Sequence, residues 1–386
     1  MAKKRIKRKI MYIIARMLSV LNQLIPKNKH IILFYDSMNP YLQDNTEAIY
    51  NYIRHTRKLN KKLFCCVPNS KVREKNIVGI YRGVLIFLRA KYVFYSFGDF
   101  RIKPSKGQMV INQWHGAPIK AIGKMMNDNI YQKEKLDNFT FLLATSPLFA
   151  NVLSKAFDCN KNKIKIIGQA RNDYLFSKKD GLAGIDIQKE NYSKMILWMP
   201  TFRVSKDNRF HDAEIKNKET LLPILKTVND LKSLNYFLNS VNVLLVIKIH
   251  SHAMFNRINL SNIKVITNDD IYPKGIKLYE FVKEFDALIT DYSSVFIDFL
   301  LLDKPIGFTL DDYESYLENR GFSIEEPIKI MPGHHIFNYE DFSSFIKDVA
   351  LSVDIYKERR KEVLKLTNSF VDAENCARLL ELVGIH

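Results

Sequence analysis

Short apolar runs alternate with longer stretches of helical periodicity along most of the chain. Runs rich in β-branched and aromatic residues predict strands at 30–35, 62–67, 92–96, 109–113, 141–144 and 163–167, and then at 195–199, 243–249, 263–266, 287–290 and 305–308. Apolar positions three or four residues apart predict helices between most of them, including 45–57, 221–239, 277–284 and 294–302. This alternation of strand and helix is typical of a parallel sheet with helices on both faces.

The polar region 177–193 has no strong periodicity and separates the pattern into two sets. We therefore expect an α/β protein with an N-terminal helix over 1–28, one Rossmann-like domain over 29–185 and a second over 186–386. The second domain ends in two or three helices from about residue 339, and their return to the first domain is compatible with the pattern. Two such domains around a central cleft fit a GT-B-like architecture, although a two-domain binding protein gives the same coarse pattern.

The N-terminus combines positive charge with an interrupted apolar stretch. Six of the first nine residues are basic: Lys3, Lys4, Arg5, Lys7, Arg8 and Lys9. The apolar stretch 10–25 contains polar residues and is shorter than the roughly 20 apolar residues that cross a bilayer. A cleaved signal peptide is an alternative, but no small-residue cleavage site follows the stretch.

As a helix, this stretch is amphipathic, because Met11, Ile14, Leu18, Leu21 and Ile25 lie near one face. A basic amphipathic helix predicts an interfacial anchor on an anionic membrane surface. The alternative is an ordinary first helix packed on the N-terminal domain, and the two interpretations are compatible.

Charge and composition limit the classes of partner. The chain has 386 residues, a net charge of +18 and 47% hydrophobic residues, which favours a folded protein with an anionic partner: nucleic acid, acidic membrane or a phosphate-rich substrate. No helix-turn-helix, zinc-finger or RNP-type signature accompanies the charge, so we expect no nucleic-acid partner. The four cysteines are scattered without metal-binding spacing, which favours a reducing compartment and no structural zinc.

A histidine follows a predicted buried strand in each half of the chain. His115 comes after the strand at 109–113, beside Gly116, and His250 follows the run that ends at residue 249. Ligands in open α/β sheets bind at the carboxyl ends of strands, so both positions suit a binding site. Residues 119–124 predict the start of a helix, and a helix N-terminus favours anions such as phosphate. The pair predicts a cleft between the domains, although each histidine alone is also explained as a structural residue.

Polar residues follow two further strands of the second half. Asp291, Ser293 and Ser294 lie between a strand and a helix, where serine hydroxyls and free backbone N–H groups form an anion site or simply cap the helix. Thr201 and Arg203 follow the first strand of this half. An arginine there can present its guanidinium to phosphate oxygens, and a surface salt bridge is the alternative.

Arg171 and Asp173 occupy a similar position after the last strand of the first half. Arg171 offers a second guanidinium, and Asp173 can cap the next segment or hold a partner in place.

Several short motifs occur in one order along the chain. They are WHGAPIK (114–120), SP (146–147), GQARND (168–173), MPTFR (199–203), KIH (248–250), ITDYSS (289–294), Asp298 and KP (304–305). This ordered set, which covers about residues 114–320, resembles the CDP-glycerol glycerophosphotransferase family. Ala117, Ala170 and Ser251 depart from the family's usual residues, but none of these departures removes an ionisable group.

The resemblance implies a GT-B-like fold with an acceptor-side N-terminal domain and a CDP-donor-binding C-terminal domain. It implies an enzyme that moves a polyol phosphate, glycerol phosphate first, from a CDP-linked donor such as CDP-glycerol or CDP-ribitol onto a lipid-linked saccharide or polyol-phosphate acceptor, releasing CMP. The product would belong to teichoic acid or a capsule-like polymer. The protein would lie peripherally on the cytoplasmic face of the cell membrane.

The resemblance also implies roles for the motif residues. His115 would be the general base, and His250 would hold the pyrophosphate or protonate the leaving CMP oxygen, although the two roles can be exchanged. The donor phosphates and nucleotide would be bound by Arg203, Thr201, Asp291, Ser293 and Ser294, with Asp291 orienting a histidine or a donor hydroxyl. Gly116, Arg171 and Asp173 would line the cleft.

No cofactor or metal is expected. The adjacent carboxylates Asp269–Asp270 and Asp311–Asp312 lie in polar loops and are better explained as solvated or capping residues than as a metal site. The glycine-rich dinucleotide and P-loop fingerprints are absent from the sequence, which disfavours NAD and P-loop chemistry. A glycosyltransferase that uses a nucleotide-sugar donor on the same architecture is the alternative within the enzyme class, and a non-catalytic nucleic-acid binder is a remote one.

Overall fold

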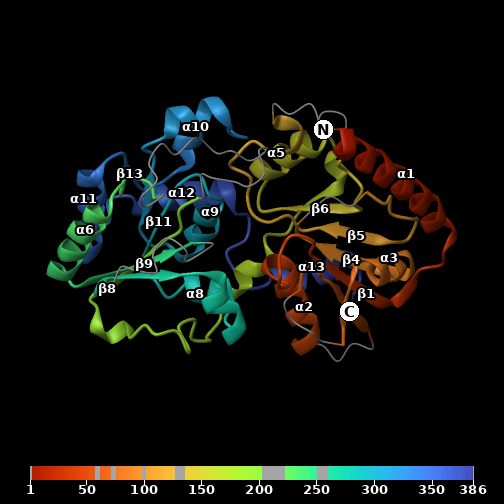
Figure 1. The fold of residues 1–386 in the computed structure, drawn as a ribbon, viewed down its shortest axis with the longest axis horizontal. Coiled ribbons are helices and arrows are strands. Elements are labelled where there is room, and N and C mark those ends of the chain that lie inside the picture. The colour runs from red at the N-terminus through yellow and green to blue at the C-terminus, as the bar shows by residue number, and fades with distance from the viewer. Residues whose placement is uncertain are drawn as a thin grey trace. The chain divides into compact units, whose positions relative to one another are not determined.

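The computed structural model describes residues 2–56, 61–70, 75–97, 101–126, 135–201, 222–249 and 260–385. The chain forms two compact units. The first contains residues 1–117, 123–176 and 369–386, and the second contains residues 118–122 and 177–368. Each unit is built on one parallel sheet (Figure 1).

The sheet of the first unit has the order β3-β2-β1-β4-β5-β6-β7, with every neighbouring pair parallel. Its strands are β1 (Asn28–Tyr35), β2 (Lys62–Cys66), β3 (Ile77–Val78), β4 (Ala90–Tyr95), β5 (Met109–Asn112), β6 (Phe141–Ala144) and β7 (Ile164–Ile166). Its helices are α1 (Ala2–Leu24), α2 (Asp44–Thr56), α3 (Ile80–Arg89), α5 (Pro147–Phe157) and α13 (Asn375–Val383).

Alternation along the strands assigns the two faces of this sheet. Ile32 and Phe34 of β1 pack in one core cluster with α2 and α13. Leu33, between them in sequence, points to the other face, towards α3 and α1. The strands are therefore buried on both faces, which explains why they read as continuous apolar runs in the sequence.

The second unit repeats this design in the order β10-β9-β8-β11-β12-β13, again with parallel pairing. Its strands are β8 (Lys194–Trp198), β9 (Val243–Lys248), β10 (Ile263–Ile266), β11 (Ala287–Thr290), β12 (Ile306–Thr309) and β13 (His334–Ile336). Its helices are α6 (Val228–Ser240), α7 (Asn268–Ile271), α8 (Leu278–Val282), α9 (Val295–Phe299), α10 (Tyr313–Asn319), α11 (Tyr339–Ala350) and α12 (Lys357–Thr367). Helices α6 and α11 share one core with Ile196 and Trp198 of β8.

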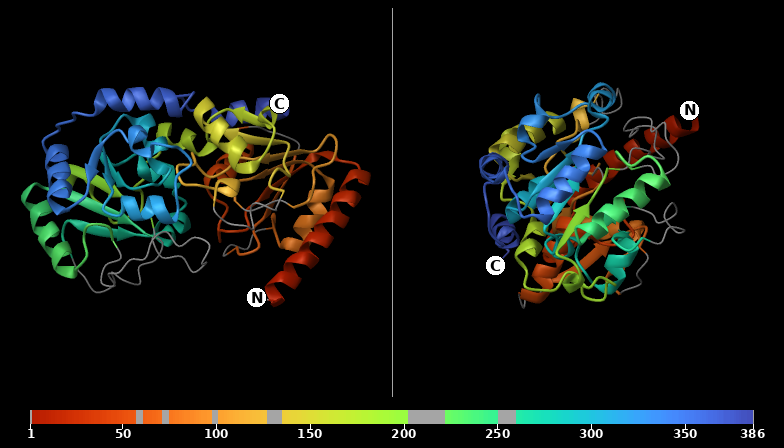
Figure 2. Two further views of the ribbon diagram at one scale, coloured as in Figure 1. Left: turned by 90° about the horizontal axis from the view of Figure 1, so that it is seen from above. Right: turned by 90° about the vertical axis from the view of Figure 1, so that its left-hand side faces the viewer.

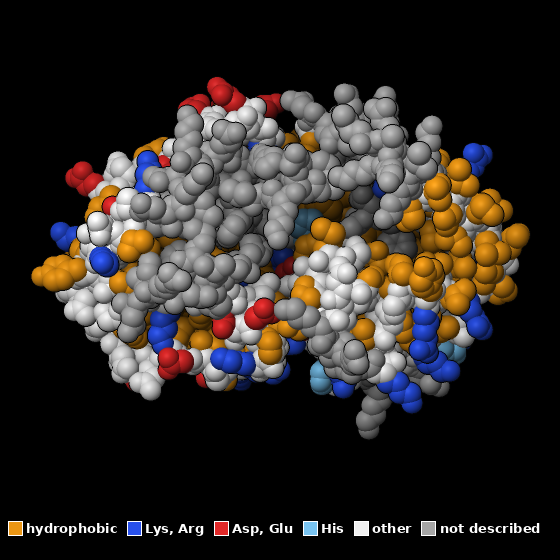
Figure 3. Space-filling model, in the orientation of Figure 1, with side chains coloured by type: hydrophobic (Ala, Val, Ile, Leu, Met, Phe, Trp, Pro, Cys, Tyr) orange, Lys and Arg blue, Asp and Glu red, His pale blue; other side chains and the backbone are white. Residues whose placement is uncertain are grey.

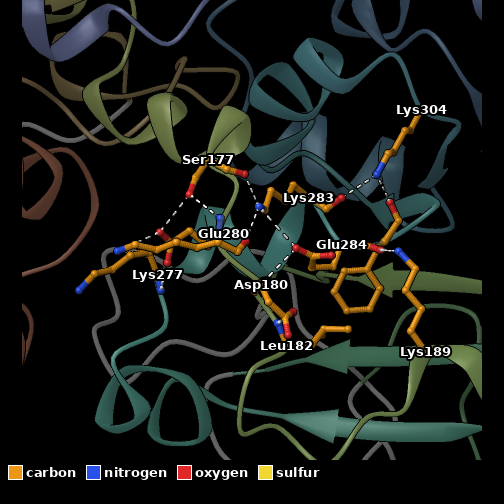
Figure 4. Close-up of polar contacts among 12 residues, drawn as sticks. Ser177, Asp180, Leu182, Lys189, Lys277, Glu280, Lys283, Glu284 and Lys304 are labelled. Atoms are coloured by element: carbon orange, nitrogen blue, oxygen red, sulfur yellow. Dashed lines mark hydrogen bonds and ion pairs between the residues drawn. The ribbon is translucent and has the colours of Figure 1, made fainter.

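The segment expected to be a linker is part of the second unit. The Lys283 ammonium, at the end of α8, donates to the backbone carbonyl oxygens of Ser177 and Lys179, and the Gly181 N–H donates to Glu284 Oε1 at 3.1 Å (Figure 4). These bonds fix the loop to α8. The division between the units therefore follows Phe176, rather than residue 185 as expected, because the polar loop finds its hydrogen-bond partners in the second unit.

The C-terminal segment 369–386 belongs to the first unit. The second domain was expected to extend to residue 386, but a return of the last helices to the first domain was compatible with the pattern. The Asp173 carboxylate explains this return. It accepts hydrogen bonds from the backbone N–H groups of Asn375 (3.0 Å) and Cys376 (2.9 Å) at the start of α13. The carboxylate thus satisfies N–H groups that have no partner within the helix.

The prediction that a helix starts at 119–124 is wrong. Residues 118–122 run along residues 321–323 instead, with Ser323 N donating to Ile119 O at 2.8 Å and Ala121 N donating to Gly321 O at 3.1 Å. The short 3₁₀ turn Gly123–Met125 follows in the described part of the chain. The hydrogen bonds to Gly321 and Ser323 take the backbone groups that a helix would use, so tertiary pairing overrides the local propensity.

Gly181 provides a test of how the loop is fixed. A Cβ added at Gly181 would lie 1.9 Å from the carbonyl oxygen of Glu280. We expect Gly181→Ala to lower the free energy of unfolding by about 1–3 kcal/mol, because the loop must move away from α8. Urea denaturation followed by circular dichroism measures this.

Gly79→Ala is the matched control. Gly79 has φ −74° and no heavy atom within 4 Å of an added Cβ, so its replacement should change the free energy by less than about 0.5 kcal/mol. Equal effects of the two substitutions would contradict the tight contact between the loop and α8.

Candidate active site

The strand order of each sheet creates a natural ligand site. In the first unit the chain order reverses between β1 and β4, and in the second it reverses between β8 and β11. Open α/β sheets bind ligands outside the carboxyl ends of the strands at such a point. His115 follows β5, beside β4, while Thr201 and Asp291 follow β8 and β11. The motif residues therefore lie at the carboxyl ends of the strands, where open α/β sheets bind ligands.

The ring of His115 is fixed in one orientation. Its Nδ1 lies 3.1 Å from the backbone carbonyl oxygen of Ser96, which follows β4. Phe97 stacks on the imidazole with ring centroids 4.8 Å apart, and Trp114 contacts it at 4.1 Å. Because a carbonyl oxygen only accepts, Nδ1 carries the hydrogen, and the lone pair of the neutral imidazole is at Nε2.

The surroundings of His115 favour this neutral form. Burial lowers the pKa of the imidazole, and the positive charge of Arg171 lowers it further. The hydrogen bond to Ser96 and the negative charge of Asp44 act in the opposite direction but do not outweigh burial. At neutral pH the imidazole can therefore accept a proton at Nε2.

The backbone around His115 is held in an unusual conformation. Trp114 has φ +55° and Gly116 has φ +130°, and only glycine adopts the second value without strain. Arg171 Nη1 donates to the backbone oxygen of His115 at 3.2 Å and to Asp44 Oδ1 at 3.0 Å. Arg171 is buried, and its hydrogen bond holds the backbone of His115 in place.

Helix α2 supplies residues that the sequence analysis missed. Asn45 Nδ2 donates to the backbone oxygen of Trp114 at 3.0 Å and also to the side-chain oxygen of Gln169, while Asn45 Oδ1 accepts from Arg171 N at 3.0 Å. Asp44 and Asn45 begin the helix after β1, and an Asp-Asn pair at a helix start is the available signal. Their contacts to residues 69 to 127 positions away could not be found from the sequence.

The second unit presents a buried carboxylate across its switch point. Asp291 is fully buried, and its Oδ2 accepts from the backbone N–H of Thr201 at 2.7 Å. The Thr201 hydroxyl donates to Asp291 Oδ1. Asp291 thereby ties the end of β8 to the end of β11, and its two oxygens hold Thr201 in place.

Lys120 joins this arrangement, although the sequence analysis assigned it no role. Its Nζ lies 3.4 Å from Thr201 Oγ1 and 5.5 Å from the centroid of the Tyr316 ring. Its backbone forms an isolated bridge with Phe322. The motif 114–120 is therefore divided: His115 belongs to the first unit, and Lys120 places a cation beside the Thr201–Asp291 pair of the second.

The remaining predicted residues differ in their setting. Ser293 and Ser294 are half-buried before α9, and Ser293 Oγ lies 3.5 Å from Val295 N, while Ser294 makes no side-chain cap. Asp173 is occupied with α13, as described above, and does not join the contacts of His115. Arg203 and His250 lie outside the described residues.

The adjacent carboxylate pairs serve local structure. Asp270 accepts from Thr267 N at 2.7 Å and caps α7. Asp311 accepts from Ile224 N at 3.2 Å, and Asp312 accepts from the Tyr292 hydroxyl at 3.0 Å. Within the described ranges no group of three or more His, Cys, Asp or Glu side chains could hold a metal ion.

Comparison with known proteins identifies the family of the chain. The family model for CDP-glycerol:poly(glycerophosphate) glycerophosphotransferase matches residues 17–384. The chain belongs to this family. The resemblance inferred from the motifs is thereby confirmed, as is the expected class of enzyme.

Two curated relatives align with most of this chain. The chain is 28% identical to a teichoic acid poly(glycerol phosphate) polymerase of Bacillus spizizenii over 78% of each chain. It is 24% identical to a teichoic acid glycerol-phosphate transferase of Staphylococcus aureus over 99% of this chain and 100% of the relative.

Solved structures support the fold. A structure of the wall teichoic acid polymerase TagF superposes with a TM-score of 0.74 at 20% identity, covering 99% of this chain and 96% of the other. UDP-GlcNAc 2-epimerase of Methanocaldococcus jannaschii gives a TM-score of 0.51 at 13% identity, covering 93% and 100%. The expectation of two parallel-sheet α/β domains is confirmed.

The hydrogen bonds of Thr201 can be tested by substitution. Thr201→Val keeps the shape but removes the hydroxyl that donates to the buried Asp291 carboxylate. A hydrogen bond to a charged group contributes about 1.5–3 kcal/mol, and we expect a loss of that size in the free energy of unfolding. Thr201→Ser keeps the hydroxyl and should lose less than half as much. Equal losses in chemical denaturation would show that the methyl group stabilises this site as much as the hydroxyl does, and would contradict the dominant role of the hydrogen bond.

Proposed function

We propose that this protein transfers a polyol phosphate, with glycerol phosphate as the first candidate, from a CDP-activated donor to a hydroxyl of a lipid-linked acceptor and releases CMP. The observation that carries the proposal is the His115 imidazole, whose Nδ1–H is held by the Ser96 carbonyl so that Nε2 is the basic nitrogen. Membership of the glycerophosphotransferase family supports the choice of reaction. The TagF variant soaked with CDPG, at a TM-score of 0.74 and 18% identity, has the same fold.

In the proposed step, the acceptor oxygen attacks the β-phosphorus of the donor. A new P–O bond forms, the bond from that phosphorus to the bridging oxygen breaks, and CMP leaves with the electron pair. The acceptor's hydroxyl proton passes to Nε2 of His115. Because phosphoryl transfer requires positioning and charge stabilisation more than covalent chemistry by the protein, the fixed ring orientation is the main contribution of this side chain.

The donor phosphates would be bound at the switch point of the second unit. Lys120 and Arg203 supply positive charge, and Thr201, Ser293 and Ser294 supply hydroxyls, with Asp291 orienting Thr201. His250 would bind the pyrophosphate or protonate the leaving CMP oxygen. Gly116, beside His115, would line the central cleft that is part of this proposal.

The acceptor's lipid would be met at a membrane surface on the cytoplasmic side, with the product a teichoic acid or a capsule-like polymer. Within the described ranges, no helix is long and apolar enough to cross a bilayer. Helix α1 runs along the outside of its unit (Figure 2). Its side chains Met17 and Val20 are 67% and 62% exposed, so α1 can lie in the interface of an anionic membrane.

The catalytic proposal is tested by CMP release from CDP-glycerol and CDP-ribitol, with and without a lipid-linked disaccharide. His115→Ala should lower acceptor-dependent release at least about a hundredfold, the usual lower range for loss of a general base. His55→Ala, which removes an exposed histidine of α2, is the control and should leave release unchanged. Release by His115→Ala at the wild-type rate would remove the base from this mechanism.

The pH profile gives a second readout. Because burial lowers the pKa of His115 below its ordinary value of 6.5, the neutral base persists at that pH, and activity should fall only at lower pH. This acidic limb should be absent from the residual activity of His115→Ala. If neither CDP donor releases CMP, a panel of nucleotide sugars tests the glycosyltransferase alternative.

The membrane proposal is tested by cosedimentation with phosphatidylglycerol vesicles. Replacing Met17 and Val20 together by Glu should weaken binding at least about tenfold, because two apolar side chains lose their burial and two negative charges approach the lipid headgroups. Tyr236→Glu in α6, at a position that is 80% exposed in the second unit, is the control and should bind normally. Equal loss in the control would point to net charge rather than to α1.

A further inference from the structure

Helix α1 packs on its unit with the polar and small side of the helix inward. Ala15 and Asn22 are buried, and Ser19 lies one turn after Ala15 on the same side. Asn22 Nδ2 donates to Lys103 O at 3.0 Å and to Gln108 Oε1 at 2.9 Å, and Ser19 Oγ accepts from Lys103 N at 3.0 Å. Most large apolar side chains of α1 are therefore left on the outside, the reverse of the usual pattern for a surface helix.

A cavity of about 760 Å³ lies between α1, α3 and the face of the sheet formed by β1 and β2. Apolar side chains from each wall line it, including Leu18 of α1, Val84 and Phe87 of α3, and Leu33 of β1. Of the described residues that line it, Arg101 is the only charged one. Its volume lies within the range typical of ligand sites, roughly 300–1,000 Å³. Apolar cavities do not hold water well and accept apolar ligands.

The cavity is continuous with an exposed apolar surface. Met11 and Ile14 of α1 are 49% and 45% exposed, and Ile80 and Leu85 of α3 are 43% and 65% exposed. All four side chains also line the cavity. Figure 3 shows the hydrophobic side chains gathered over this part of the first unit. A patch of this kind marks a surface that contacts an apolar partner.

The charged side chains that the structure describes on α1 and α3 all have the same sign. Neither α1 nor α3 contains an acidic residue. Arg16, Arg82 and Arg89 are exposed on these two helices, and Arg101 lines the cavity itself. An apolar cavity with basic residues around it is complementary to a molecule that joins a hydrocarbon chain to an anionic headgroup.

We propose that this cavity binds one acyl chain of an anionic membrane phospholipid, with the lipid phosphate near Arg101. The proposal rests on the proposed membrane contact of α1, but not on the transfer reaction. The bound chain would cover the apolar walls between α1 and α3, and it would fix the orientation of the first unit on the membrane. A helix that only lies on the surface cannot provide such a fixed orientation.

The experiment uses the full-length protein and vesicles of phosphatidylcholine with phosphatidylglycerol, whose acyl chain carries a diazirine. After photolysis, mass spectrometry locates the labelled residues. We expect adducts on the cavity residues Val84, Phe87 and Leu33 as well as on the surface residues Met17 and Val20. Adducts on the surface residues alone would overturn the proposal while leaving the membrane contact of α1 intact.

Two substitutions compare a filled cavity with an unchanged one. Ala15→Trp places an indole into the cavity, whereas Val20→Trp adds the same group to the outward side of α1, away from the lining residues. Filling the cavity should lower the cavity adducts about tenfold or more, because excluding roughly two methylene groups changes a binding constant by that factor. Val20→Trp should keep them. Unchanged cavity adducts in Ala15→Trp would overturn the proposal.

A second variant, Val84→Phe on α3, fills the same cavity from another wall, so the test does not depend on the folding of Ala15→Trp alone. Thermal melts of both variants must match the wild type.

Addition of a polyprenyl phosphate distinguishes the source of the chain. Adducts that persist support an acyl chain, and adducts that disappear at equimolar polyprenyl phosphate would assign the cavity to an isoprenoid chain and overturn the proposal. Because the readout is lipid labelling, the result is independent of CMP release.

Discussion

The hydrogen bond from the His115 imidazole to the Ser96 carbonyl is the interaction on which the proposed chemistry depends. It joins the end of β4 to the end of β5, and it decides which ring nitrogen carries the hydrogen. Trp114 and Gly116, on either side of His115, have positive φ values, and Arg171 and Asn45 donate hydrogen bonds to the backbone oxygens of His115 and Trp114. A parallel sheet makes this possible because neighbouring strands end at the same edge, so residues distant in sequence meet there.

In the second unit, hydrogen bonds between different residues also join the ends of two neighbouring strands. Asp291 takes the central position, and its buried carboxylate ties Thr201 to the neighbouring strand. Lys120 connects the two arrangements through the chain, because the segment that contains His115 continues directly into the residues paired with 321–323. A single short motif therefore contributes to both units.

Helix α1 follows a different rule from the other helices. The helices α2, α6, α11 and α13 bury apolar side chains against a sheet. In contrast, α1 makes its specific contacts through Ser19 and Asn22 and leaves its large apolar side chains outside. Hydrogen bonds thus fix the position of α1, and its exposed apolar side chains can still be buried against a partner. The proposed membrane contact and the proposed lipid binding both bury this exposed apolar surface.

The sequence by itself determined the strands of both sheets, the division into two α/β halves and the positions of His115, Thr201 and Asp291 at strand ends, because buried parallel strands are continuous apolar runs. The sequence pattern did not predict two strands, because β3 is very short and β13 begins with two histidines. Only the tertiary structure decided the path of residues 118–122, the inward side of α1, the place of α13, and the support that Asp44 and Asn45 give to Arg171 and His115. Each of these depends on hydrogen bonds between residues distant in sequence, which leave no periodic signal in the chain.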